Sequence, residues 1–139
     1  DQPRSRGLGD VYKRQIYLQR GGALQRISRD HTKYQEQLDA GAAAADATDN
    51  PDRHVLTQYL GMLGARQRLM PYFAASVPLA VGDRLLLCTD GLVNTVTDQE
   101  MLFEIVHGGD LDTCLDRLLH ISKSQGAPDN VTAVLMQKL

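Results

Sequence analysis

The stretch Arg84-Leu85-Leu86-Leu87-Cys88-Thr89-Asp90-Gly91 decides how this sequence is interpreted. Its apolar run is short, does not alternate and follows the turn signal Gly82-Asp83, so it predicts a strand buried on both faces. The strand ends in the carboxylate of Asp90. Such an acid is poorly solvated and needs a cation or hydrogen-bond donors, and Gly91 lets the backbone turn tightly or approach a ligand closely. The alternative is a turn aspartate that caps the following segment.

A second acidic stretch lies near the end of the sequence. Gly126–Asn130 is predicted to be a loop, and Val131–Met136 is a strand by composition. Asp129 therefore stands before the start of one strand, whereas Asp90 stands at the end of another, and the two carboxylates can meet if these strands are adjacent and antiparallel. Oxygen ligands with no His or Cys beside them favour Mg²⁺, Mn²⁺ or Ca²⁺ over zinc. An Asx turn with Asn130 is the alternative interpretation of Asp129.

These two stretches resemble the C-terminal motifs of the metal-dependent protein phosphatases of type 2C. The motifs are Leu86–Leu92 and Gly126–Thr132. Further segments agree with the family in order and spacing: Arg29–His31, Arg53–Thr57 followed by Leu60-Gly61, and Val81–Arg84. The resemblance covers Ile16 to Leu139 and is closest to the bacterial branch that opposes serine/threonine kinases. The stretch Arg29–Leu60 favours this branch over the related phosphatases of anti-sigma-factor antagonists.

The resemblance implies an α+β fold, as part of a four-layer α-β-β-α sandwich in which two antiparallel sheets are flanked by helices. Residues 16–139 would supply the C-terminal portion of this domain. The family's N-terminal metal ligands, its phosphate-holding basic residue and its proposed general-acid histidine find no match in this sequence. No catalytic residue is therefore assigned, and the chain alone is expected to be an inactive fragment.

The implied activity is hydrolysis of phosphoserine and phosphothreonine in proteins by two-metal activation of water, with Mn²⁺ or Mg²⁺. Asp90 and Asp129 match family metal ligands, and Gly91 and Asn130 are candidates for backbone or outer-sphere support of these acids. Asn94 stands where many members carry an aspartate that helps to bind a third ion, so its neutral amide argues against a strong third site. The alternative function is a catalytically inactive member of the fold that acts as a regulatory or binding module.

The expected partners are phosphorylated proteins, the substrates of a serine/threonine kinase, and the complete protein is expected to be a cytoplasmic monomer. A formal net charge of −2 and a hydrophobic share of 42% over 139 residues do not suggest a nucleic-acid binder or a disordered tail. No apolar run approaches the roughly 18 residues that span a membrane, and no signal-peptide pattern is present. Cys88 and Cys114 lie in apolar contexts and are interpreted as buried reduced thiols, with a disulfide as the alternative.

Residues 1–15 are interpreted as a non-native leader. Residues 1–10 show no helix or strand periodicity, and Asp10–Gln15 matches one reading frame of a common transposase sequencing adaptor. Members of the family usually carry Gly-Asp-Ser-Arg where this sequence has Tyr12–Gln15. The alternative is a divergent native strand, in which Val11-Tyr12 pairs in a sheet.

The remaining elements are predicted from local patterns. The first part of the chain is expected to form a hairpin over Ile16–Ile27 with its turn at Arg20–Ala23, a helix over Lys33–Ala40 ended by Gly41, and a surface loop or a short helix over Gly41–Asn50. Strands are predicted over Val55–Leu60 and Leu69–Ala75. A later helix starts at a Thr97–Glu100 capping box and turns Met101, Leu102, Ile105 and Val106 inward, and Asp110 caps the helix after it.

Overall fold

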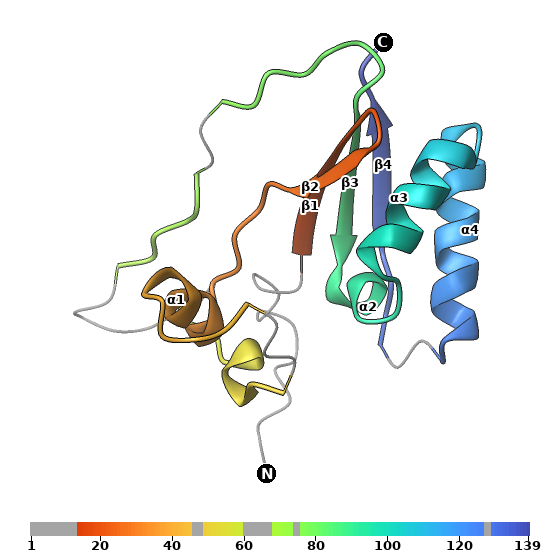
Figure 1. Cartoon of the computed structure of the whole chain (residues 1–139). Coiled ribbons are helices and arrows are strands. Elements are labelled where there is room, and N and C mark those ends of the chain that lie inside the picture. Colours follow the sequence, from red (N-terminus) through yellow and green to blue (C-terminus); the bar gives the residue numbers. More distant parts are fainter. Residues whose placement is uncertain (1–13, 46–48, 60–67, 74–75, 127–128) are drawn as a thin grey trace. The chain divides into compact units, whose positions relative to one another are not determined.

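The computed structural model of the protein describes residues 14–45, 49–59, 68–73, 76–126 and 129–139 (Figure 1). Within these ranges, residues 29–73 belong to one compact unit, and residues 14–28 and 76–139 belong to a second. The predicted leader lies outside the described residues, except that Arg14 and Gln15 form the start of the first strand.

The second unit is built on a four-stranded antiparallel sheet with the order β2-β1-β3-β4. The strands are β1 (Arg14–Arg20), β2 (Ala23–Arg26), β3 (Arg84–Thr89) and β4 (Ala133–Gln137). The hairpin prediction is confirmed, because β1 and β2 are joined by a turn in which Gly21 has a φ of 55°. The apolar stretch Arg84–Thr89 is β3, and it lies inside the sheet between β1 and β4 (Figure 1).

Three helices of the described chain lie on one side of this sheet: α2 (Asp90–Val93), α3 (Asp98–His107) and α4 (Leu111–Ser124) (Figure 1). The predicted capping box of α3 is confirmed, since the Thr97 hydroxyl accepts from the Glu100 amide and the Glu100 carboxylate accepts from the Thr97 amide. The Asp110 carboxylate caps α4 as predicted. None of the helices in the described ranges is both long enough and apolar enough to cross a membrane.

One face of the sheet forms a hydrophobic core with the helices. Paired residues of an antiparallel sheet share a face, so Tyr17, Leu86 and Leu135 point toward the helices together. They pack with Met101 and Ile105 of α3, which are fully buried. The inward orientation predicted for Val106 is wrong: it is 42% exposed, and Leu102 is only half-buried. Cys88 and Cys114 are buried and free, which confirms the prediction of reduced thiols.

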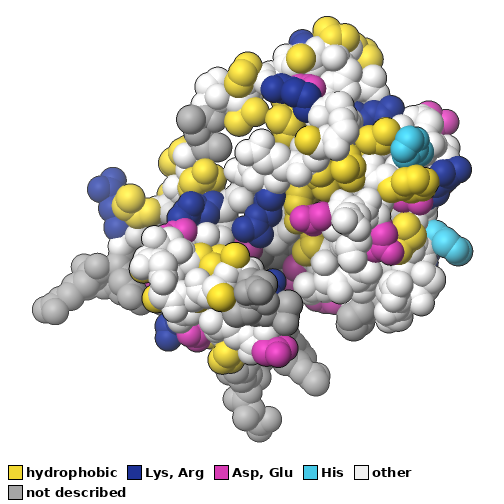
Figure 2. All heavy atoms as spheres, in the orientation of Figure 1, with side chains coloured by type: hydrophobic (Ala, Val, Ile, Leu, Met, Phe, Trp, Pro, Cys, Tyr) yellow, Lys and Arg dark blue, Asp and Glu magenta, His cyan; other side chains and the backbone are white. Residues whose placement is uncertain are grey.

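The opposite face of the sheet is only partly covered. Leu87 pairs with Ile16 and with Val134, and Val134 is 50% exposed. Hydrophobic side chains are accordingly visible at the surface of the protein (Figure 2). The prediction that the apolar run is buried on both faces is therefore wrong for the described unit: Leu86 is 1% exposed, whereas Leu87 is half-buried. The reason is that the helices cover one face alone.

The other unit contains α1 (Lys33–Asp39) and the 3₁₀ helix η1 (Pro51–His54). The helix prediction is confirmed, with Gly41 after the C-cap at a φ of 68°. The strand prediction for Val55–Leu60 is wrong over its described part, where Leu56 forms an isolated bridge with Thr32. Residues 69–73 form no strand either; residues 46–48, 60 and 74–75 of the predicted loop and strands lie outside the described residues.

Arg20 and Asp83 clamp the end of the sheet from which β3 starts. Nε of Arg20 lies 3.1 Å from each carboxylate oxygen of Asp83, and Nη2 lies 2.5 Å from Oδ2 and 2.7 Å from the Pro78 carbonyl. The same carboxylate accepts from the Ala80 amide at 2.8 Å. These hydrogen bonds, with that from Arg20 the largest, hold the pKa of the buried Asp83 carboxyl below its ordinary value.

We expect Asp83→Asn to lower the melting temperature by several degrees at pH 7, because an amide cannot accept the paired hydrogen bonds of the guanidinium. The folded-state pKa is below the unfolded value of about 3.9, so this stabilisation is present above that value and is lost as the pH falls through the folded-state pKa. Melting followed by circular dichroism should therefore show a difference that shrinks below about pH 4. The matched control is Asp112→Asn, at an exposed carboxylate on α4; a difference for Asp83→Asn that is equal at pH 7 and pH 3 would contradict this account.

Candidate metal-binding site at the end of β3

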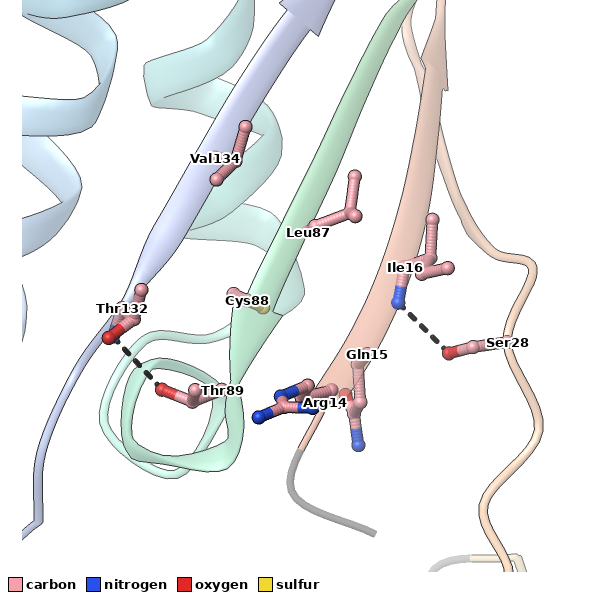
Figure 3. A pocket seen from close by; sticks show the side chains of 9 residues that line it. All are labelled: Arg14, Gln15, Ile16, Ser28, Leu87, Cys88, Thr89, Thr132 and Val134. Carbon is pink, nitrogen blue, oxygen red and sulfur yellow. Dashed lines mark hydrogen bonds between the residues drawn. The ribbon is translucent and has the colours of Figure 1, made fainter. Parts of the chain in front are cut away.

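Asp90 lies where β3 passes into α2. Thr89 is the last residue of the strand and the N-cap of the helix, with an extended backbone, and Asp90 is the first residue of α2. The Thr89 hydroxyl does not cap the helix. It accepts instead from the Thr132 amide at 3.0 Å and lies 3.3 Å from the Asn130 carbonyl, so it joins the end of β3 to the segment that precedes β4 (Figure 3).

Asp129 reaches the same edge of the sheet because β3 and β4 are antiparallel. Their last ladder pair is Cys88 with Ala133, and the Thr89 amide continues the pairing by donating to the Thr132 carbonyl at 3.0 Å. The two strands thus meet the condition stated for the approach of the two carboxylates, since they are adjacent and antiparallel. As a result, the segments that carry Asp90 and Asp129 meet at one edge of the sheet.

Gly91 packs directly against the backbone that follows Asp129. A Cβ atom at Gly91 would lie 2.2 Å from the Asn130 carbonyl oxygen and 3.2 Å from Cγ2 of Val131. Real Cβ contacts are never this short, so the two acidic segments approach this closely only because residue 91 has no side chain. This observation supports the interpretation of Gly91 as a residue of close backbone approach.

The two carboxylates differ in their surroundings. Asp129 is exposed, and its Oδ1 accepts from the amide of the next residue, Asn130, at 2.7 Å. An Asx turn is closed by the amide two residues on, so this hydrogen bond is not the one that defines the Asx-turn alternative. Asp90 is half-buried, and its charge, added to the larger effect of burial, raises the pKa of the Cys88 thiol to about 12. The Cys88 thiol therefore stays protonated at neutral pH.

The chemistry of the donors fits a hard divalent cation. The acids at this edge offer oxygen atoms, which suit Mg²⁺ and Mn²⁺. Among the residues that the structure describes, no group of three or more His, Cys, Asp or Glu side chains is close enough to hold a metal ion. Asn94 is exposed and is the C-cap of α2, where its backbone amide donates to the Asp90 carbonyl at 2.9 Å. The site in this chain thus offers two candidate carboxylates.

A pocket of about 330 Å³ lies on the partly covered face of the sheet, next to this edge. Its walls include the side chains of Ile16, Leu87 and Val134, which point to the same side of the sheet in Figure 3. The pocket shares Thr89 and Thr132 with the edge at which the acidic segments meet. Sequence reasoning did not identify Thr89 as part of the site, because a threonine beside an Asp-Gly pair is an ordinary turn residue.

Known proteins resemble the chain over most of its length. The serine/threonine phosphatase Stp of Listeria welshimeri is 31% identical over 123 residues, which are 88% of this chain and 47% of Stp. The chain is a homologue of bacterial serine/threonine phosphatases. The resemblance to the type 2C family that the sequence motifs suggested is confirmed. No protein-family model matches the chain.

Solved structures extend this homology to the fold. PppA, described as a key regulatory component of T6SS in Pseudomonas aeruginosa, superposes on the chain with a TM-score of 0.74 at 33% identity. The superposition covers 95% of this chain and 50% of PppA. The catalytic domain of the serine/threonine protein phosphatase PstP, solved in complex with two manganese ions, superposes with a TM-score of 0.67 at 29% identity over 92% of this chain and 50% of that domain. The chain thus spans about half the length of the phosphatases it matches.

We expect Gly91→Ala to destabilise the protein by about 1–3 kcal/mol, the usual cost of forcing extra atoms into a packed site. The new methyl group would overlap the Asn130 carbonyl, and backbone cannot move aside as a flexible side chain can. Urea denaturation followed by circular dichroism measures the change. Gly22→Ala is the matched control, because a Cβ there meets nothing within 4 Å. Equal stability of the two variants would show that the close approach at Gly91 is not a constraint.

Proposed function

We propose that Asp90 and Asp129 are metal ligands of a serine/threonine protein phosphatase. The observation that carries the proposal is the meeting of their two segments at one sheet edge, with Gly91 packed on the Asn130 backbone. The homology to serine/threonine phosphatases and the two manganese ions in the PstP catalytic domain support it.

Mn²⁺ or Mg²⁺, when bound in pairs, supplies activation of water and stabilisation of developing charge for the hydrolysis of phosphoserine and phosphothreonine. The role proposed for this chain is to hold the metal ions and to orient their ligands. Asp90 and Asp129 would provide anionic oxygen ligands, and Gly91 and Asn130 would fix the two segments through their backbones. Asn94 would offer a third ion an amide without charge, so we propose that such an ion binds weakly or not at all.

We propose that residues 16–139 are the C-terminal portion of a four-layer sandwich. A second antiparallel sheet would then pack on the face that carries Ile16, Leu87 and Val134, which the helices leave partly open. Burial of this apolar face would be favourable by about 25 cal/mol for each Å² removed from water. The TM-scores to phosphatases of about twice the length support this arrangement.

The proposed substrates are proteins phosphorylated by a serine/threonine kinase, in the cytoplasm, and we propose a monomeric complete protein. The homologues support this substrate class, since they are named serine/threonine phosphatases. Acidic and basic side chains are interspersed on the face shown in Figure 2.

The second candidate is a regulatory or binding module that has the phosphatase fold without catalysis. One observation favours it: the described residues hold no cluster of three potential metal-binding side chains. The two candidates differ in what they require of Asp90. A phosphatase site needs its carboxylate for metal binding, whereas a binding module does not.

We expect the 139-residue chain to bind Mn²⁺, and Asp90→Asn or Asp129→Asn to weaken this binding about tenfold or more, within the range observed when partners of a metal site are removed. Titration of Mn²⁺ followed by water-proton relaxation measures the affinity. Asp112→Asn removes the same charge from an exposed position on α4 and should leave the affinity unchanged. Equal affinities for all variants would favour the binding module.

We also expect the chain alone to show negligible turnover of a phosphothreonine peptide with Mn²⁺, because two carboxylates are too few for a pair of ions. Sequencing of the source DNA upstream of the codon for Ile16 is expected to show an in-frame continuation with Gly-Asp-Ser-Arg and an earlier Asp-Gly motif. The protein expressed with that continuation should be active, and Asp90→Asn should lower its kcat by about 100-fold. Turnover by the chain alone that Asp90→Asn abolishes would contradict the first expectation, and a genomic frame that encodes residues 1–15 as given would contradict the second.

A further inference from the structure

Two hydroxyl groups connect α4 to the turn that follows Asp90. Oγ of Ser122 lies 2.7 Å from Oγ1 of Thr95, and Oγ1 of Thr95 lies 3.0 Å from the carbonyl oxygens of both Gly91 and Leu92. Ser122 is fully buried in the middle of the packed helices. A polar side chain is rarely found in such a place unless its hydrogen bonds are made there.

The direction of these hydrogen bonds follows from the number of protons. Carbonyl oxygens only accept, so the single hydroxyl proton of Thr95 is directed to the carbonyls of Gly91 and Leu92. The bond between the two hydroxyls must then use the proton of Ser122. The chain therefore runs from Ser122 to Thr95 and on to the backbone of α2.

The Gly91 carbonyl depends on this chain because α2 is short. In a regular α-helix the Thr95 amide would donate to the Gly91 carbonyl, but here it donates to the Leu92 carbonyl at 3.1 Å. The Thr95 hydroxyl takes its place. A helix of one turn has little stability of its own, so its orientation depends on contacts with the rest of the protein.

We propose that Thr95 and Ser122 are positioning residues that hold Asp90 in the orientation required to bind a divalent cation. The proposal rests on the proposed function of Asp90 as a metal ligand. Asp90 is the first residue of the single turn α2, and the hydroxyl chain holds the carbonyl of the next residue, Gly91. Helix α4, which supplies Ser122, ends at Ser124 and leads toward Asp129. One helix thus fixes the turn of the first acid and precedes the loop of the second.

A purely structural role is the competing explanation, and conservative variants separate the two. Thr95→Val keeps the shape of the side chain and removes its hydroxyl, whereas Thr95→Ser keeps the hydroxyl. Ser122→Ala removes the buried donor. Ser124→Ala is the matched control. The Ser124 hydroxyl is exposed and donates to the Ile121 carbonyl at 2.8 Å on the same helix, and it makes no hydrogen bond to α2 within the described part of the chain.

The experiment is a Mn²⁺ titration of the 139-residue chain by water-proton relaxation, with the folded fraction of each variant checked by circular dichroism at the same temperature. We expect Thr95→Val and Ser122→Ala to weaken Mn²⁺ binding roughly three- to tenfold, the equivalent of one hydrogen bond. Thr95→Ser and Ser124→Ala should bind as the wild type does. The double variant T95V/S122A should bind no more weakly than Thr95→Val, because the two hydroxyls act in one chain.

Unchanged affinity in folded Thr95→Val and Ser122→Ala, with weaker binding by Asp90→Asn, would overturn the positioning role and leave the metal site intact. A lower melting temperature without a change in affinity would overturn it in the same way. If Thr95→Val does not fold, Ser122→Ala and Thr95→Ser decide the question through the same comparison. Mn²⁺ binding that is absent, or insensitive to Asp90→Asn, would overturn the metal site itself and the positioning role with it.

Discussion

The candidate site depends on the antiparallel pairing of β3 with β4. The register that pairs Leu86 with Leu135 sends both side chains into the core, and a shift of one residue would turn them to the opposite face. The hydrophobic core therefore fixes the register. The register in turn brings the end of β3 and the approach to β4 to one edge, where Gly91 meets the Asn130 backbone. Packing at the centre of the sheet thus determines which acidic segments meet at its end.

Features that depend on near neighbours in the sequence could be predicted, and those that depend on distant partners could not. The capping box of α3 closes within one helical turn, so Thr97 and Glu100 reveal it directly. A strand is stabilised by its neighbours as much as by its composition, which explains why the prediction for residues 55–60 was wrong in its described part. The link between Thr95 and Ser122 spans 27 positions and joins two residue types that are common on surfaces, so no local sequence pattern predicts it.

The apolar run in β3 predicts burial on both faces of the strand, whereas the described unit buries only one. Leucines without alternation indicate burial on both faces, yet the helices cover only the face of Leu86. Leu87 and Val134 on the opposite face remain partly exposed although their composition suits a core. The mismatch is confined to one face, and the chain spans about half the length of its homologues. Both observations are accounted for by the second sheet in the proposed sandwich.

The weakness of α2 as a helix explains why hydrogen bonds remote from a cation would influence its binding. A ligand that moves freely must lose that freedom when it binds, and this loss is subtracted from the affinity. Asp90 lies on a single turn whose Gly91 carbonyl is linked through Thr95 to Ser122 of α4. The residue before Asp90, Thr89, is linked through its hydroxyl to the Asn130 carbonyl. The ordering of the carboxylate is then accomplished when the protein folds. Stability of the core and affinity of the site are in this way properties of the same contacts, because the helix that buries Ser122 also orients the acid.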